Sequence, residues 1–148
     1  MTSTISPSGL PLHYVHPQHS KAMDREDIRN LRRWQVDATK RALAAGFDLV
    51  YVYAGHGYLP MQFVSRQFNH RSDEYGGSEA NRMRFITEIT EAVRTHWPDD
   101  KPLFVRLSVE DNAGWGPEQS VRLAKILKAK GVDVIDCSSG GITEMAPI

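Results

Sequence analysis

Two tyrosines and a histidine, separated by small residues, stand together in the stretch Tyr53-Ala54-Gly55-His56-Gly57-Tyr58. A phenol and an imidazole can share a hydrogen bond, and either can donate to an anionic ring or to a developing oxyanion. A lone histidine is more often structural than catalytic, but His56 lies on a glycine-rich turn directly after an apolar run. We therefore take Tyr53, His56 and Tyr58 as candidate catalytic residues.

A single cation, Arg106, interrupts the apolar run from Leu103 to Val109. Because an unpaired buried cation is costly, Arg106 must meet either an anion or an electron-rich acceptor. A structural ion pair with Asp136 or Glu110 would satisfy it, and so would a ligand. The residue by itself leaves both interpretations open.

Asp136 lies near the end of another apolar run and precedes the loop Ser138-Ser139-Gly140-Gly141. It is either a tie between a helix and the sheet or part of a site. Cys137 is the one cysteine of the chain, which excludes a disulfide framework and a cysteine-based zinc site. No base is visibly set beside it, so we expect a small buried hydrophobe.

The elements that must position these residues are apolar runs alternating with amphipathic helices. Strands are expected at 47–53, 103–109 and 132–138, and helices at 24–46, 78–97 and 117–131. Asp24 with Asp27, Ser78 and Pro117 are signals for helix starts, and Gly46 and Gly131 for helix ends. The order α-β-α-β-α-β predicts an α/β fold with a parallel sheet and right-handed crossovers. In such folds ligands bind beyond the carboxyl ends of the strands, where the candidate residues lie.

The apolar faces of the later helices can be assigned from their spacing. Met83, Ile86, Ile89 and Val93 form the face expected for the second helix, and Val121, Ala124, Ile126, Leu127 and Ala129 form that of the third. Two stretches are expected to lack regular structure, namely a lead-in at 1–22 and a long connection at 54–77. Connections of that length are uncommon unless they carry function. Residues 23–148 form the remaining unit.

Three histidines in the lead-in, His13, His16 and His19, have the spacing of a helical metal face. The prolines at 11 and 17 disfavour a helix there, and no carboxylate joins the set. We therefore predict no metal site.

Composition excludes several classes of partner. The chain has 148 residues, with 18 Lys and Arg against 18 Asp and Glu, so its formal net charge is zero. A protein that depends on phosphate contacts is usually basic, so nucleic acid is not expected as the main partner. No apolar run is long enough to span a membrane and no signal peptide is recognisable, which favours the cytoplasm. The chain is too short for a complete eight-fold β/α barrel, which needs about 250 residues.

Several motifs in order resemble the old yellow enzyme family of FMN-dependent oxidoreductases. They are Ala45-Gly46-Phe47-Asp48, His56-Gly57-Tyr58-Leu59, the stretch from Asn69 to Ser78 with Asn81-Arg82, Leu103 to Ser108, and Val132 to Gly141. The match runs from about Met23 to Ile142, and the stretch Asn-x-Arg-x-Asp-x-Tyr-Gly-Gly-Ser is its most specific part. Ene-reductases of the family usually carry His-x-x-His or His-x-x-Asn where this chain has Tyr53-Ala54-Gly55-His56. Tyr-x-x-His is similar to the trimethylamine, dimethylamine and histamine dehydrogenase branch, whereas the strand from Leu103 looks more like the ene-reductase branch.

The resemblance implies a partial TIM barrel of about three parallel strands, matching the fourth to sixth strands of the family, with FMN as cofactor and NAD(P)H as a possible reductant. Arg106 would then reach the N1/O2 edge of the flavin, and His56 and Tyr53 would lie over the flavin and the substrate. Tyr58 would line the pocket or donate a proton. Asp136 is the candidate for the aspartate that orients the Tyr–His pair in the amine dehydrogenase branch.

Two functions follow as hypotheses. The first is hydride transfer through FMN to or from a small organic substrate, either an activated alkene or an amine. The alternative is a non-catalytic fragment or interaction module that needs the missing barrel strands, supplied by a homo-oligomer or by a complementing chain. A complete small binding domain fits less well, because the sequence ends without covering its last strand. Whether this chain alone is active stays open at this point.

Overall fold

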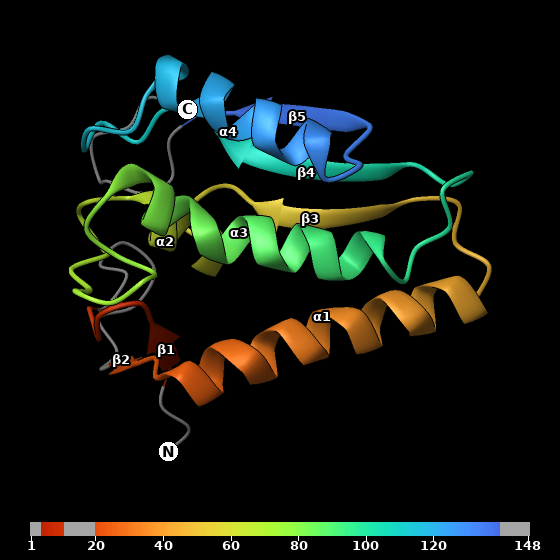
Figure 1. The fold of residues 1–148 in the computed structure, drawn as a ribbon, viewed down its shortest axis with the longest axis horizontal. Coiled ribbons are helices and arrows are strands. Elements are labelled where there is room, and N and C mark those ends of the chain that lie inside the picture. The colour runs from red at the N-terminus through yellow and green to blue at the C-terminus, as the bar shows by residue number, and fades with distance from the viewer. Residues whose placement is uncertain (1–3, 11–19, 140–148) are drawn as a thin grey trace.

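A parallel sheet with helices on one face organises the part of the chain that the computed structural model describes, residues 4–10 and 20–139. The elements in chain order (Figure 1) are β1 (Thr4–Ser6), β2 (Ser20–Ala22), α1 (Arg25–Ala44), β3 (Val50–Ala54), α2 (Leu59–Val64), α3 (Glu79–Arg94), β4 (Leu103–Ser108), α4 (Pro117–Ala129) and β5 (Val134–Ser138). The main sheet has the order β3-β4-β5, and both neighbouring pairs are parallel. The predicted α/β architecture is confirmed.

The helices begin where the capping residues of the sequence lie. The Asp24 side chain accepts a hydrogen bond from the Asp27 backbone N–H at 2.9 Å, and the Asp27 side chain accepts one from the Asp24 N–H at 3.0 Å. The Ser78 hydroxyl accepts from the Asn81 N–H, and Pro117 is the first residue of α4. Each side-chain cap satisfies a backbone donor that the helix leaves without an internal partner.

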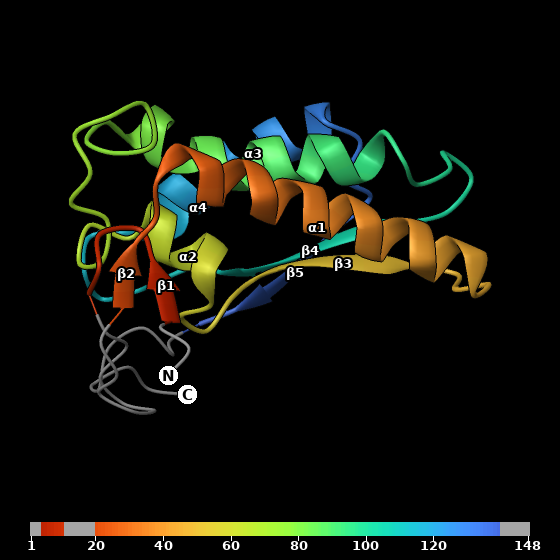
Figure 2. The same ribbon diagram turned by 90° about the horizontal axis from the view of Figure 1, so that it is seen from below.

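Helices α1, α3 and α4 lie on the same side of the main sheet (Figure 2). The strand residues that face them are buried, and they are Val52, Ala54, Leu103, Val105 and Leu107. The predicted apolar face of α3 is confirmed, since Met83, Ile86, Ile89 and Val93 are all buried, together with Phe85. Burial of such side chains contributes about 1.5 to 3 kcal/mol each, so this layer holds the sheet in place.

The predicted buried face of α4 is partly wrong. Val121 and Ile126 are exposed, at 54% and 40%, while Leu123 and Leu127 are buried with Ser120. The buried positions are spaced by three and four residues, so they form one helical stripe. Val121 and Ile126 lie beside that stripe, outside the contact with the sheet.

Two stretches that were expected to be irregular contain short regular elements. Within the lead-in, β1 pairs with β2 in parallel, with Thr4 opposite Ser20. Within the long connection, α2 spans six residues with a proline in its first turn and no side-chain hydrogen bond at its N-cap. Elements this short carry little periodicity, which explains why the sequence pattern did not reveal them. His13, His16 and His19 lie outside the described residues.

The later part of the long connection, residues 69–78, ties the lead-in to the rest of the fold; we call it the clasp. Its Arg71 guanidinium donates to the Asp73 carboxylate at 2.9 and 2.5 Å. It also donates to the backbone carbonyl of Pro7 at 2.9 Å and to that of Met23. The motif that was most specific for the family is therefore a structural tie in this fold.

Cys137 is exposed and free, which contradicts the prediction that it is a small buried hydrophobe. It pairs in register with the buried Leu107, but β5 is an edge strand of the described sheet. Among the described residues, no helix is long and apolar enough to cross a membrane. The same part of the chain holds no group of three or more His, Cys, Asp or Glu side chains placed to bind a metal ion.

Candidate active site

The carboxyl ends of the three main strands bring the candidate residues together. Register places Tyr53 of β3 opposite Arg106 of β4, and Arg106 opposite Asp136 of β5. Ser108 and Ser138 face each other one side-chain position further along. Because side chains alternate across a strand, these five residues share the face of the sheet opposite to the buried core.

Tyr53 and His56 share a hydrogen bond, as a phenol and an imidazole can. The Tyr53 hydroxyl lies 2.8 Å from Nδ1 of His56. A tight turn brings them together, closed by a 3.0 Å bond from the Tyr58 N–H to the Gly55 carbonyl. His56 itself has a φ of 49°, a conformation that non-glycine residues rarely adopt and that recurs at functional sites.

Two serines from neighbouring strands hold His56 in this conformation. Its backbone N–H donates to the Ser108 hydroxyl at 2.8 Å, and its Nε2 is hydrogen-bonded to the Ser138 hydroxyl. Neither serine was among the residues chosen from the sequence. The only signal was that Ser138 opens the glycine-containing loop after the third apolar run.

Arg106 and Asp136 form an ion pair, with Nη1 at 2.8 Å from Oδ2, so one of the two open interpretations of Arg106 is realised. Both side chains are about one third exposed, at 32% and 29%. The guanidinium carbon lies 5.9 Å from the centre of the Tyr53 ring, so a cation stands beside the phenol. In the described part of the chain, the buried Nε of Arg106 has no hydrogen-bond partner, and the guanidinium therefore keeps a donor to spare.

Asp136 was chosen as the residue that orients the Tyr–His pair, and the contact that the structure gives it is with Arg106. The group that meets Nε2 of His56 is the Ser138 hydroxyl. The role of Asp136 toward Tyr53 and His56 thus stays a prediction, and any such effect would pass through Arg106.

Tyr58 stands at the rim of the same cluster. It is the N-cap residue of α2, it is 62% exposed, and its ring meets that of Tyr53 edge-on at 4.9 Å. Both rings line a cavity of about 250 Å³ along the β3 edge. Tyr58 can therefore reach a small molecule that lies against Tyr53.

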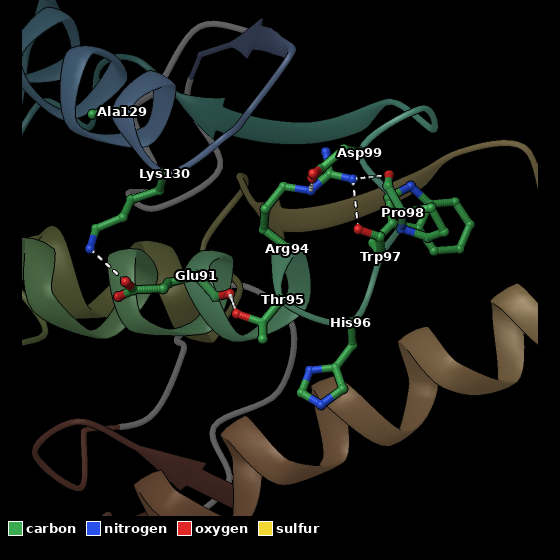
Figure 3. A pocket seen from close by; sticks show the side chains of 9 residues that line it. All are labelled: Glu91, Arg94, Thr95, His96, Trp97, Pro98, Asp99, Ala129 and Lys130. Atoms are coloured by element: carbon green, nitrogen blue, oxygen red, sulfur yellow. Dashed lines mark hydrogen bonds and ion pairs between the residues drawn. The ribbon is translucent and has the colours of Figure 1, made fainter.

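A larger cavity, of about 670 Å³, lies at the opposite end of the sheet, between the end of α3 and the end of α4 (Figure 3). Its central side chain, Arg94, donates to the backbone carbonyls of Trp97, Pro98 and Lys101. These bonds secure the loop that leads into β4. In parallel α/β folds the amino ends of the strands serve stability rather than chemistry, so we place the site at the other end.

The strand-end residues fit the ring of a flavin. A guanidinium with a spare donor suits the electron-rich edge of an isoalloxazine, and a phenol paired with an imidazole suits a ligand above it. The described residues offer the ring these polar groups on one open face. A glycine-rich phosphate cradle was not found in the sequence, so the fit concerns the ring.

Comparisons with known proteins identify the family of the chain. The model of the NADH:flavin oxidoreductase / NADH oxidase family matches residues 2–147. The chain belongs to this family. It is 43% identical to the NADH:flavin oxidoreductase FG08077 of Gibberella zeae, over 93% of this chain and 36% of that protein.

Two solved structures have a similar fold. Histamine dehydrogenase from Rhizobium sp. 4-9 superposes with a TM-score of 0.83 at 35% identity, covering 97% of this chain and 22% of that one. The old yellow enzyme homologue from Zymomonas mobilis superposes with a TM-score of 0.80 at 30% identity, covering 97% and 44%. The βα units described above are therefore part of a TIM barrel. The chain spans about two fifths of the length of the curated relatives it matches.

Proposed function

We propose that this chain is an FMN-dependent oxidoreductase that itself binds the flavin ring and a small organic substrate, either an activated alkene or an amine. The observation that carries the proposal is the hydrogen bond between Tyr53 and His56 beside the Arg106 guanidinium. NAD(P)H is the proposed reductant, supported by relatives named NADPH dehydrogenase. The cytoplasm remains the proposed compartment, as expected from the composition.

Each side chain has a proposed role that follows from its chemistry. FMN, when bound, supplies the hydride-transfer chemistry. Arg106 would hold the flavin at its electron-rich edge, and Asp136 would fix the guanidinium through their 2.8 Å ion pair. Tyr53 and His56 would bind the polar group of the substrate, with His56 also beside the flavin. The exposed Tyr58 would line the pocket or donate a proton.

A second candidate function is supported by the open face of the sheet. Tyr51 and Val134 are 44% and 39% exposed there, and β3 and β5 each have one neighbour in the described sheet. Unpaired strand edges readily accept further strands. The alternative is thus a module without activity of its own, which pairs with a second copy or with a chain that supplies the other barrel strands.

An absorbance scan of the purified chain, with and without FMN and together with its mass in solution, separates the two functions. The proposed oxidoreductase predicts a flavin spectrum that is shifted from that of free FMN and persists after gel filtration. A colourless monomer or oligomer that ignores FMN would contradict it and favour the complementing module.

A further inference from the structure

We propose that Ser138 is the positioning residue of the site. Its hydroxyl fixes the imidazole of His56 in one tautomer, and this tautomer leaves the phenol proton of Tyr53 free for a ligand. The inference depends on the proposed function in one respect, namely that a ligand lies against Tyr53. The residue that orients His56 is then Ser138, a neutral hydroxyl on β5. Asp136, the carboxylate expected from the sequence to have this role, lies two residues earlier on the same strand.

His56 is held by hydrogen bonds from two adjacent strands. Ser108 and Ser138 are partners in the β4–β5 register, and they bind the backbone N–H and the ring Nε2 of His56, respectively. The Tyr53 hydroxyl binds the other ring nitrogen at 2.8 Å. The imidazole is thus held at both nitrogens, and its unusual backbone φ of 49° is held by a third bond.

The direction of the hydrogen bonds depends on which ring nitrogen of His56 carries the proton. Among the described residues, the hydrogen-bond partner of the Ser138 hydroxyl is Nε2 of His56. A neutral imidazole carries a proton on one nitrogen and accepts at the other. If Ser138 donates to Nε2, then Nδ1 carries the proton and donates to the Tyr53 oxygen. The O–H of Tyr53 then points to a hydrogen-bond acceptor outside the chain of three residues.

A carboxylate in place of Ser138 would reverse this order. Because an ionised carboxylate only accepts, it would draw the proton to Nε2, and Nδ1 would then accept the phenol proton of Tyr53. Asp136 is the nearby carboxylate on β5, and its oxygen is engaged by Arg106 at 2.8 Å. With a hydroxyl at position 138 that donates to Nε2, Tyr53 offers a donor to the ligand, whereas with a carboxylate there it would offer an acceptor.

Nitrogen-15 NMR of the histidine rings in the full chain, recorded without flavin, tests the proposal directly. Wild-type His56, assigned from its loss in His56→Asn, is expected to show a protonated Nδ1 and an unprotonated Nε2. Ser138→Thr keeps the hydroxyl and should retain this pattern. Ser138→Ala should give a mixture of tautomers, and Ser138→Asp should move the proton to Nε2.

The control is Ser139→Ala, which removes the exposed hydroxyl next in the chain and should leave the His56 signals unchanged. The signals of His70 and His96 report whether each variant is folded. A protonated Nε2 in the wild type, or an unchanged pattern in a folded Ser138→Ala variant, would overturn the proposal. Flavin binding is measured separately, so a chain that ignores FMN but shows the expected tautomer would contradict the proposed function alone.

Discussion

The clasp and the strand-end site are both dense in polar side chains, yet they use them in opposite ways. In the clasp, the Arg71 side chain is 10% exposed, and its guanidinium donates hydrogen bonds to the Asp73 carboxylate and to two backbone carbonyls. At the strand ends, Tyr58 is 62% exposed and the buried Nε of Arg106 lacks a partner among the described residues. Buried polar groups are normally satisfied, so spare capacity of this kind is what a ligand can use.

Backbone strain divides the two regions in the same way. The clasp contains adjacent glycines that accommodate its tight path, and no non-glycine residue of the clasp has a positive φ. The strand-end site places a histidine, at a φ of 49°, in a conformation that glycine adopts more easily. The clasp thus satisfies its donors without a strained non-glycine residue, whereas the strand-end cluster combines a strained histidine with an unpartnered donor.

The largest effect on stability is expected from a substitution of Gly76 in the clasp. A Cβ at this position would lie 2.2 Å from the Arg71 carbonyl oxygen, a backbone atom that cannot move away without shifting the main chain. Gly76→Ala should therefore lower the free energy of unfolding by about 3 kcal/mol or more. Urea denaturation followed by circular dichroism measures the change.

The neighbouring Gly77 provides the matched control. It has a φ of 74°, but a Cβ there would meet nothing within 4 Å. Gly77→Ala should cost only about 1 to 2 kcal/mol, from the left-handed backbone alone. Equal losses for the two variants would mean that the close approach inside the clasp does not restrain the fold.

The ion pair of the clasp should make stability depend on acid. The hydrogen bonds from Arg71 hold the pKa of the Asp73 carboxyl below its ordinary value of 3.8. The stabilisation is then complete above pH 3.8 and is lost as pH falls through the lower pKa of the folded state. Asp73→Asn should cost about 1.5 to 3 kcal/mol at pH 7, and the difference from the wild type should shrink at lower pH.

Urea titrations from pH 7 to about pH 2 measure this convergence. Asp48→Asn is the control, because its side chain is 98% exposed in its pair with Lys101. The exposed pair should show almost no change with pH. A gap between wild type and Asp73→Asn that stays constant down to the lowest pH would show that the carboxylate charge is not what the clasp uses.

The elements were predictable because their signals are local. The helix-start signals at Asp24, Ser78 and Pro117 act within one turn, and the apolar periodicity of α3 identified its buried face. The errors occurred where packing decides. Val121 lies just outside the stripe of α4 that contacts the sheet, and Cys137 lies on an edge strand, and neither fact is written in the local pattern.

The site was predictable to the extent that its parts are close in sequence. Tyr53 and His56 are three residues apart, and a glycine turn suffices to bring them into contact. The pairing of Arg106 with Asp136 remained open, because it depends on the register between β4 and β5. A shift of the β4–β5 register by one residue would move every side chain of β5 to the other face of the sheet. Ser138 was missed for the same reason, since only that register brings its hydroxyl to the imidazole.

The unused donor of Arg106 is tested by flavin affinity. Hydrogen bonds to charged groups contribute about 1.5 to 3 kcal/mol, so Arg106→Ala should weaken FMN binding by about 10- to 100-fold. Arg122→Ala, which removes an exposed arginine paired with Glu79 on the helical side, should leave the affinity unchanged. Quenching of flavin fluorescence measures both. If Arg106→Ala leaves the FMN affinity unchanged, the ion pair between Arg106 and Asp136 has only a structural role, like the ion pair of the clasp.

The smallest effect should separate the two binding partners of the site. His56→Ala removes the support of the Tyr53 hydroxyl, so binding of 4-nitrophenolate, an aromatic oxyanion that hydrogen-bond donors recognise, should weaken by about 10-fold. FMN affinity should fall by less, because the proposed contact of Arg106 with the flavin is left in place. His96→Ala at the opposite end of the sheet is the control, and it should change neither. If His56→Ala weakens the binding of both ligands equally, the imidazole supports the whole strand-end site rather than its substrate side. The contrast with the clasp would then depend on Arg106 and Tyr58.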